Sequence, residues 1–364
     1  MPKDVLEAAS ETAVYHRSED FYKVFRECME GLRPVFGSST QPLILTSSGT
    51  GAMEATMVSL TAPQDEVVVV NGGKFGERWE KLARTYQCDT AVVPVEWGHA
   101  PTSAAIVAAI RTQKKTRAVF MQANETSTGA YYPVEAIAKD LRANGFDGLL
   151  VVDCISALCA HTMRMDAWGI DAVVAGSQKG FGLPPGLAFV SLSERAWKNL
   201  SSRPRFYFDL GKERKGQEEG RSAWTPAASL VFGLHAALAS MHKVGIDQMV
   251  AHHGTLAEAT RSAVKAMGLE LFAASAPSNA LTSITVPRGI DGSRLLKRIR
   301  QRFGMYFAGG QDELKGKIIR LSHLGFVSRF DILDGIAALE FALHEEGFGH
   351  DLGSGVKAAM RHML

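Results

Sequence analysis

Residues 149–180 read LLVVDCISALCAHTMRMDAWGIDAVVAGSQKG, and they contain the two stretches that decide the fold. In the first stretch, the apolar run 149–152 ends directly at Asp153. In the second, the apolar run 172–175 is followed by Gly176, Ser177, Gln178 and Lys179. Short, entirely apolar runs are typical of strands that are buried on both faces of a parallel sheet. The sequence therefore predicts two buried strands, each followed closely by a charged side chain at its carboxyl end.

The same pattern extends in both directions along the chain. Further apolar runs alternate with stretches of helical periodicity, which predicts a mostly parallel sheet with helices on both faces and hence an α/β fold. We expect strands at 43–45, 67–70, 91–95, 118–121 and 187–190, and helices at 21–32, 76–86 and 134–143. The segment 201–224 is rich in charge, glycine and proline. It is too long for an ordinary connection, so we expect it to be either mobile or functional.

The last part of the chain predicts a second, smaller domain. Residues 226–267 have a helical pattern that is interrupted by the stop and restart signal Gly245-Ile246-Asp247. Strands are expected at 281–286 and 317–321, and helices at 293–303 and 330–344. Because a single core rarely grows past about 250 to 300 residues, we expect a large domain over 1–245 and a small C-terminal α/β domain over 246–364.

Composition excludes several classes of function. The 40 basic and 38 acidic residues leave a net charge of only +2, which argues against nucleic acid or a membrane surface as the partner. The four cysteines show no metal-binding spacing and are too sparse for a disulfide framework, which favours a reducing compartment. No apolar run reaches the roughly 18 residues that span a bilayer, and the N-terminus lacks a signal-peptide pattern. We therefore expect a cytoplasmic protein that binds small molecules and no metal.

A turn of small residues follows the first expected strand. It reads Thr46-Ser47-Ser48-Gly49-Thr50-Gly51-Ala52-Met53-Glu54 and leads into a helix. Such a turn leaves main-chain N–H groups free at a helix N-terminus, where they can bind an anion. It has neither the Gly-Lys-Ser/Thr ending of a P-loop nor the three glycines of a dinucleotide site. A tight turn without a ligand would have the same sequence, so this turn alone decides nothing.

Asp153 and Lys179 gain meaning from their positions at strand ends. Burying a carboxylate is costly unless a cation or strong donor meets it, and a protonated pyridine nitrogen is such a partner. Burial also lowers the pKa of a lysine, as an amine that forms a Schiff base requires. Separately, they could be a turn aspartate and a surface lysine. With the anion turn, they supply the ring-nitrogen, aldehyde and phosphate contacts of pyridoxal 5'-phosphate (PLP).

Six segments of the chain resemble the class-V aminotransferases of PLP fold type I, in the alanine–glyoxylate and serine–pyruvate group. They are SSGTGAMEA (47–55), NGGKFGERW (71–79), ETSTGAYYPVE (125–135), VVDCISAL (151–158), MDAWGIDAVVAGSQKGFGLPPGLAFVS (165–191) and AGGQDELKGKIIRLSHLG (308–325). The likeness runs from about residue 5 to residue 345, with the motifs in matching order. It implies a large PLP domain, a small C-terminal domain and a homodimer whose active sites lie at the subunit interface.

The resemblance also implies a role for individual residues. Lys179 and Asp153 match the two catalytic positions, the lysine that binds PLP as a Schiff base and the partner of the pyridinium nitrogen. The remaining cofactor positions are Thr50, Gly51, Ala52 and Gln178 at the phosphate, Phe75 stacked on the ring, Ile155 beside it, Thr126 near O3', and Thr225, which reaches the phosphate from the other subunit. Arg320 resembles the arginine that binds the substrate α-carboxylate.

This sequence departs from the family pattern at its start and at two further positions. It begins Met1-Pro2-Lys3, whereas members usually carry an upstream Leu-x-Pro-Gly-Pro-type segment that helps to line the site. Ala52 and Ser222 stand where some members have a histidine and a tyrosine. From the different start we expect the substrate pocket to differ from the family more than the cofactor site does, and from Ala52 and Ser222 we expect phosphate contacts through the backbone and smaller groups.

The leading hypothesis is transamination of a small amino acid, such as alanine or serine, with a 2-oxo acid such as glyoxylate or pyruvate. Another PLP reaction, by a lyase or an aminophosphonate transaminase, is the close alternative. A desulfurase ranks low, because Cys154 and Cys159 follow the cofactor strand instead of lying on a mobile loop near the substrate. A non-catalytic subunit on the same fold is the alternative from another class, and the retained pair Asp153 and Lys179 argues against it.

Overall fold

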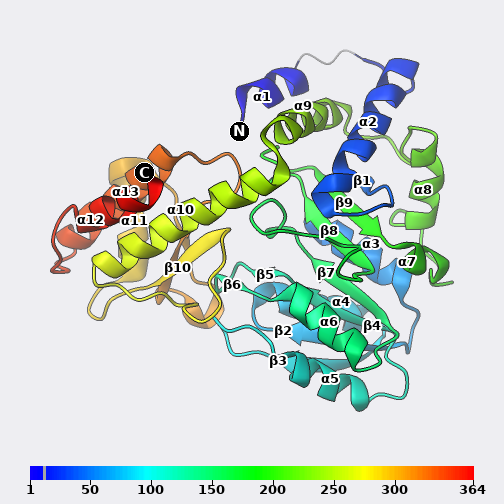
Figure 1. Cartoon of the computed structure of the whole chain (residues 1–364), viewed down its shortest axis with the longest axis horizontal. Helices are drawn as coiled ribbons and strands as arrows, with labels where there is room; N and C mark the ends of the chain where they lie inside the picture. The colour runs from blue at the N-terminus through cyan, green and yellow to red at the C-terminus, as the bar shows by residue number, and fades with distance from the viewer. Residues whose placement is uncertain (11–13) are drawn as a thin grey trace.

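A seven-stranded sheet forms the centre of the computed structural model, which describes residues 1–10 and 14–364 (Figure 1). The strand order is β1-β9-β8-β7-β4-β2-β3. The strands are β1 (Leu43–Thr46), β2 (Glu66–Asn71), β3 (Asp89–Pro94), β4 (Ala118–Gln122), β7 (Leu149–Asp153), β8 (Ala172–Gly176) and β9 (Leu187–Leu192). From β8 to β3 all neighbours are parallel, while β9 runs antiparallel to both β1 and β8. The predicted mostly parallel sheet is confirmed, and all seven expected strands belong to it.

Helices cover both faces of this sheet. Along β2 the valines alternate, so that Val68 and Val70 belong to one apolar core and Val67 and Val69 to the other. The core with Val68 receives side chains from α2 (Glu19–Phe36), α6 (Val134–Ala143) and α9 (Ala228–Val244). The opposite core receives side chains from α3 (Gly49–Leu60), α4 (Lys74–Thr85) and α7 (Glu194–Lys198). A strand that is buried on both faces has no polar side to alternate with, which is why its sequence is a continuous apolar run.

The charged segment 201–224 contains a helix that its composition does not suggest. Asp209 begins α8 (Leu210–Glu218), because its side chain accepts hydrogen bonds from the first N–H groups of the helix. On the same helix, Gln217 accepts from the N–H of Ile44 and donates to its C=O, at 2.9 and 2.8 Å. Since Ile44 lies on the edge strand β1, α8 protects an edge that would otherwise expose unpaired backbone groups.

The C-terminal part of the chain forms a second α/β unit with its own apolar core. A three-stranded antiparallel sheet has the order β10-β12-β11 and packs with four helices. Its elements are α10 (Ile246–Ala266), β10 (Leu281–Thr285), α11 (Gly292–Phe303), β11 (Ala308–Gly309), the 3-10 helix η1 (Asp312–Leu314), β12 (Ile318–Ser322), α12 (Arg329–Glu345) and α13 (Ser354–Met363). The expected strands and helices of this region are confirmed, whereas α13 was not expected. The domain boundary at residues 245/246 remains a prediction.

Three smaller elements complete the chain. Helix α1 (Lys3–Ser10) lies along α9, and α5 (Ser103–Arg111) lies beside β3 (Figure 1). The strands β5 (Asn124–Glu125) and β6 (Ala130–Tyr131) form a short hairpin between β4 and α6. The sequence analysis predicted none of these three elements.

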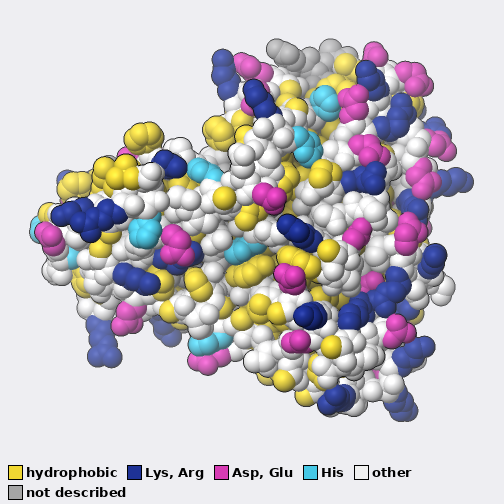
Figure 2. All heavy atoms as spheres, viewed as in Figure 1, with side chains coloured by type: hydrophobic (Ala, Val, Ile, Leu, Met, Phe, Trp, Pro, Cys, Tyr) yellow, Lys and Arg dark blue, Asp and Glu magenta, His cyan; other side chains and the backbone are white. Residues whose placement is uncertain are grey.

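Over residues 1–10 and 14–364, no single helix is long and apolar enough to cross a membrane, although α9 and α10 together, bent by 83° at Gly245, meet the criterion as a pair. On the face shown in Figure 2, the side chains of Lys and Arg are interspersed with those of Asp and Glu.

Candidate active site

Asp153 is a buried carboxylate at the carboxyl end of β7. Its Oδ1 accepts a hydrogen bond of 2.8 Å from the N–H of Ile155, while its Oδ2 accepts none from the described residues. Burial raises the pKa of Asp153 to about 7. The Ile155 hydrogen bond and the charges of Arg78 and Lys179 oppose this shift, and the charge of Glu125 adds to it. The carboxyl group therefore has one free acceptor oxygen and lacks a full counter-charge.

Lys179 follows the neighbouring strand β8, so its side chain starts from the same edge of the sheet as Asp153. The lysine is half-buried, and burial lowers the pKa of its amine; the Asp153 charge opposes this shift and the Arg320 charge reinforces it. The structure thus brings together the two strand-end groups that the sequence singled out. Gln178, the residue before Lys179, is exposed.

The small-residue turn forms the N-terminus of α3. Ser48 is the N-cap, but its side chain accepts no hydrogen bond from the helix. The N–H groups of Gly49, Thr50 and Gly51 have no acceptor among the described residues, whereas that of Ala52 donates to the Ser48 carbonyl oxygen at 3.2 Å. Three free N–H groups at the positive end of a helix favour an anion. The predicted contact of the Ala52 N–H with a phosphate remains a prediction.

Arg78 is a cation at this turn that the sequence analysis missed. Its Nη1 donates to Thr50 Oγ1 at 3.1 Å, and its guanidinium lies 4.9 Å from the centre of the Phe75 ring. It forms no ion pair with a carboxylate of the described residues. The spacing could have given this signal, because residues three apart on a helix share a face and Phe75 lies in the first turn of α4.

Arg320 reaches the site from the small domain. On β12, its Nε and Nη2 donate to the Gly309 carbonyl oxygen at 3.0 and 2.7 Å, and its Nη1 donates to the carbonyl oxygen of Thr126. The described residues offer this half-buried guanidinium no carboxylate partner at ion-pair distance. Burial lowers its pKa, although the charge of Glu125 opposes the shift. The structure therefore holds Arg320 in place with main-chain carbonyls and leaves its positive charge uncompensated.

Thr225 lies two residues before Ala227, whose N–H donates to Thr46 Oγ1 of the small-residue turn at 3.0 Å. Thr225 is exposed in the segment between α8 and α9, and it lines a groove of about 660 Å³ together with Lys212, Lys215 and Arg221. Within the part of the chain that the structure describes, no hydrogen bond connects Thr225 to the Asp153 and Lys179 site. Its predicted role depends on a second subunit and remains untested by this single chain.

Comparison with known proteins identifies the family. Residues 4–314 match the family described as Aminotransferase class-V. The chain belongs to the class-V aminotransferases. It is 38% identical to the "Soluble hydrogenase, small subunit" of Synechococcus sp. (strain PCC 6716), over 99% of this chain and 95% of that protein. It is also 32% identical to the serine–glyoxylate aminotransferase of Methylorubrum extorquens, over 100% and 93%.

A solved structure agrees with this family. The ureidoglycine–glyoxylate aminotransferase of Bacillus subtilis superposes with a TM-score of 0.92 at 26% identity, over 100% of this chain and 95% of that one. The predicted family, the aminotransferase class and fold type I are therefore confirmed.

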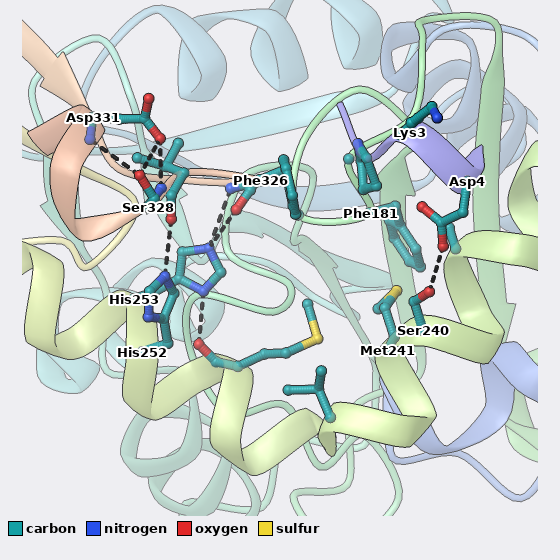
Figure 3. A pocket seen from close by; sticks show the side chains of 18 of the residues that line it. Lys3, Asp4, Phe181, Ser240, Met241, His252, His253, Phe326, Ser328 and Asp331 are labelled. Atoms are coloured by element: carbon teal, nitrogen blue, oxygen red, sulfur yellow. Dashed lines mark hydrogen bonds between the residues drawn. The ribbon is translucent and has the colours of Figure 1, made fainter. Parts of the chain in front are cut away.

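Figure 3 shows a wide cavity whose lining includes Gly180, the residue after Lys179, but not Lys179 itself. It has a volume of about 820 Å³ and lies between α1, α9, α10 and the segment 325–331, with residues 180–182 as one wall. Its polar groups are already paired, as in His252 with the Val327 carbonyl and Ser240 with Asp4. None of the predicted catalytic, cofactor or substrate residues lines it. We therefore place the candidate site at the strand ends and not in this cavity.

The residues at the strand ends fit the cofactor of the class-V aminotransferases. The free Oδ2 of Asp153 can accept from a ring N–H, the three free N–H groups of α3 can bind a phosphate, and Lys179 supplies a primary amine. Over the described residues, no group of three or more His, Cys, Asp or Glu side chains lies close enough to hold a metal ion. The donor set is thus suited to an anionic heterocycle with an aldehyde.

Proposed function

We propose that this class-V aminotransferase uses PLP to transfer an amino group between a small amino acid, such as alanine or serine, and a 2-oxo acid such as glyoxylate or pyruvate. The observation that carries the proposal is the meeting of Asp153, Lys179 and Arg320 at one edge of the sheet. Within the described residues none of these three groups forms an ion pair at direct contact, although the charges of Asp153 and Lys179 influence each other. The names of the serine–glyoxylate and ureidoglycine–glyoxylate relatives support the choice of glyoxylate.

The cofactor-binding residues are proposed from the family resemblance, and the free N–H groups of the α3 turn support the phosphate position. The α3 turn with Thr50, Gly51 and Ala52 would hold the phosphate, together with Gln178. Phe75 would stack on one face of the ring, Thr126 would lie near O3', and Ile155 would lie beside the ring. When bound, PLP supplies an aldehyde that accepts amino groups and a ring that withdraws electrons from the substrate Cα.

The proton chemistry belongs to Lys179 and Asp153. A neutral Lys179 amine could remove the Cα proton of a bound amino acid and deliver it to the aldehyde carbon of the cofactor, because burial favours the uncharged form of the amine. Asp153 would hold a negative charge against the ring N–H of bound PLP and so would keep that nitrogen protonated. A protonated ring nitrogen in turn gives Asp153 the counter-charge that it lacks, which lowers its pKa.

Arg320 is suited to bind the carboxylate that amino acids and 2-oxo acids share. Its planar guanidinium can form two parallel hydrogen bonds to a carboxylate, and its present partners are only main-chain carbonyls. Because donor and acceptor share this group, one arginine serves both halves of the reaction.

We further propose that the protein works as a homodimer in the cytoplasm. Thr225 is exposed beside Lys212 and Lys215, a suitable position for contact with the phosphate of a partner subunit. Support for the reducing compartment comes from the four cysteines, all of which are free and buried. Burial raises the pKa of the Cys159 thiol to about 12, which disfavours the thiolate that a desulfurase needs.

The name of the Synechococcus relative raises a second candidate function, a subunit of a soluble hydrogenase. Such a subunit would not need the paired Asp153 and Lys179, whose burial is costly. Two assays separate the candidates. The purified protein should turn yellow with PLP and transfer amino groups from alanine, serine, glycine or an aminophosphonate to glyoxylate or pyruvate. Hydrogen-dependent dye reduction without any of these activities would favour the second candidate.

A further inference from the structure

Glu125 is a carboxylate with no role in the proposed chemistry, although it is fully buried next to the site. It lies in the hairpin strand β5, directly before Thr126. Burial raises its pKa, and hydrogen bonds from Ser127, Gly76 and Phe75 oppose that shift. With Gln122, five donors surround its two oxygens. Burying a carboxylate costs folding free energy unless its oxygens accept hydrogen bonds, as those of Glu125 do.

The hydrogen bonds show what this carboxylate does. Its Oε2 accepts from the N–H groups of Phe75 at 3.1 Å and Gly76 at 3.0 Å, and its Oε1 accepts from the Ser127 hydroxyl at 2.5 Å. The same hydroxyl accepts from the N–H of Lys74 at 3.1 Å. Glu125 and Ser127 thus satisfy the first three N–H groups of α4, a helix about fifty residues away whose own N-cap, Gly73, has no side chain to do so.

The backbone at Gly73 is shaped for this contact. A Cβ at Gly73 would lie 2.4 Å from Ser127 Oγ and 2.6 Å from Glu125 Cδ, so both capping side chains would have to move away from the start of α4. The missing side chain therefore lets the carboxylate reach the start of α4. The position of Phe75, on the first turn of that helix, depends on this approach.

The loop that contains Glu125 and Ser127 also contacts Arg320, which is proposed to bind the substrate carboxylate. Thr126, between the two capping residues, accepts from Arg320 through its carbonyl oxygen. Gln122 donates to Glu125 Oε2 at 2.9 Å and so fixes the carboxylate from the end of β4. One buried carboxylate thus connects Phe75, Thr126 and Arg320, which come from three separate segments.

We infer that Glu125 is a positioning residue, whose carboxylate caps α4 from a distant loop and thereby holds Phe75 and Thr126 in register for the cofactor. This inference rests on the proposed function for the identity of the cofactor. The cap itself is a property of the chain alone, so it can be measured without any ligand.

The test compares Glu125→Gln with Glu66→Gln. Glu66 also accepts from two main-chain N–H groups, those of Lys114 and Lys115, but at the opposite edge of the sheet. Whichever way a glutamine at 125 is turned, its NH2 group faces a main-chain N–H, of Ser127 or of Gly76. In the cofactor-free protein, hydrogen exchange of residues 74–76 should become faster by about tenfold or more in Glu125→Gln and stay unchanged in Glu66→Gln.

The second readout is PLP affinity, followed by absorbance. Glu125→Gln should raise the dissociation constant roughly tenfold, and Glu66→Gln should leave it unchanged. In a Phe75→Leu background the further effect of Glu125→Gln should be clearly smaller, because it acts through Phe75. If Glu125→Gln does not fold, Ser127→Ala, which removes one arm of the same cap, should change exchange and affinity in the same direction.

The outcomes separate the inference from the proposed function. Unchanged exchange at residues 74–76, unchanged PLP affinity, or fully additive effects of Glu125→Gln and Phe75→Leu would each overturn the positioning role. If the wild-type protein binds no PLP, the proposed function and the positioning role toward the cofactor both fail. Faster exchange in Glu125→Gln would still show that the cap exists.

Discussion

Asp153 and Lys179 follow adjacent parallel strands, β7 and β8, and each lies close enough to the other to shift its pKa. The carboxylate charge opposes the loss of the lysine proton, and the ammonium charge opposes protonation of the carboxylate. In the described residues neither group has a hydrogen-bonded ion-pair partner. The cofactor-free site therefore contains two unsatisfied groups whose natural partners are a ring nitrogen and an aldehyde.

Asp153 should make the stability of the cofactor-free protein depend on pH. Its folded pKa of about 7 is raised above the unfolded value of 3.8, so its contribution to stability is fully present below about pH 4 and is lost as pH rises through 7. Asp153→Asn removes this dependence. Urea unfolding from pH 4 to 8 should show the wild type losing up to a few kcal/mol relative to Asp153→Asn. Parallel curves for the two proteins would contradict the raised pKa.

The same variant should slow the chemistry. Without an anionic partner the ring nitrogen loses its proton more easily, so exchange of the substrate Cα proton should fall on the order of a hundredfold. The exchange of that proton into deuterated water, followed by NMR, measures the step directly. An exchange rate equal to that of the wild type would mean that Asp153 is only a turn residue.

Arg320→Lys should weaken the productive binding of amino acids and of 2-oxo acids to a similar extent, while PLP stays bound. A lysine keeps the charge but loses the planar fork, at a cost of about 2 to 3 kcal/mol, or roughly thirty- to a hundredfold in kcat/KM. Steady-state kinetics with donor and acceptor varied in turn provide the measurement. Release of PLP with an unchanged substrate KM would show that the arginine has a different role.

Thr225→Val tests whether Thr225 contacts the cofactor phosphate in the site of the partner subunit. If the hydroxyl binds the partner's phosphate, its loss should weaken PLP binding about fivefold without changing the fold. Thr255→Val on α10, the same change far from the site, is the matched control. Sedimentation with and without PLP should also show tighter association with the ligand, because binding and assembly are linked. A fully active monomer would contradict the shared site.

The sequence predicted the strands well, because a strand that is buried on both faces is a continuous apolar run, as at 149–152. Strand direction leaves no such trace, so the reversed direction of β9, which is antiparallel to both β1 and β8, could not be recognised. Helix α8 was missed because its stability comes from the Asp209 cap and the contact of Gln217 with β1. A long-range contact has no local signature.

In the site, too, residues that act through long-range contacts left no local pattern in the sequence. Asp153 and Lys179 were predictable because each follows an apolar run, a pattern visible in a few residues. Glu125 and Arg78 act on groups far away in sequence, Glu125 on Phe75 and Arg78 on Thr50. Their roles become visible only when the fold brings α3, α4 and the β5–β6 hairpin together.

The central claim is that Lys179 carries the cofactor. The most direct measurement is to incubate the purified protein with PLP, reduce it with borohydride, digest it and locate the modified lysine by mass spectrometry. We expect a reduced pyridoxyl group on the peptide that contains Lys179, its absence in Lys179→Ala, and loss of transamination in that variant. An unmodified Lys179, or near-wild-type turnover by Lys179→Ala, would contradict the proposed function.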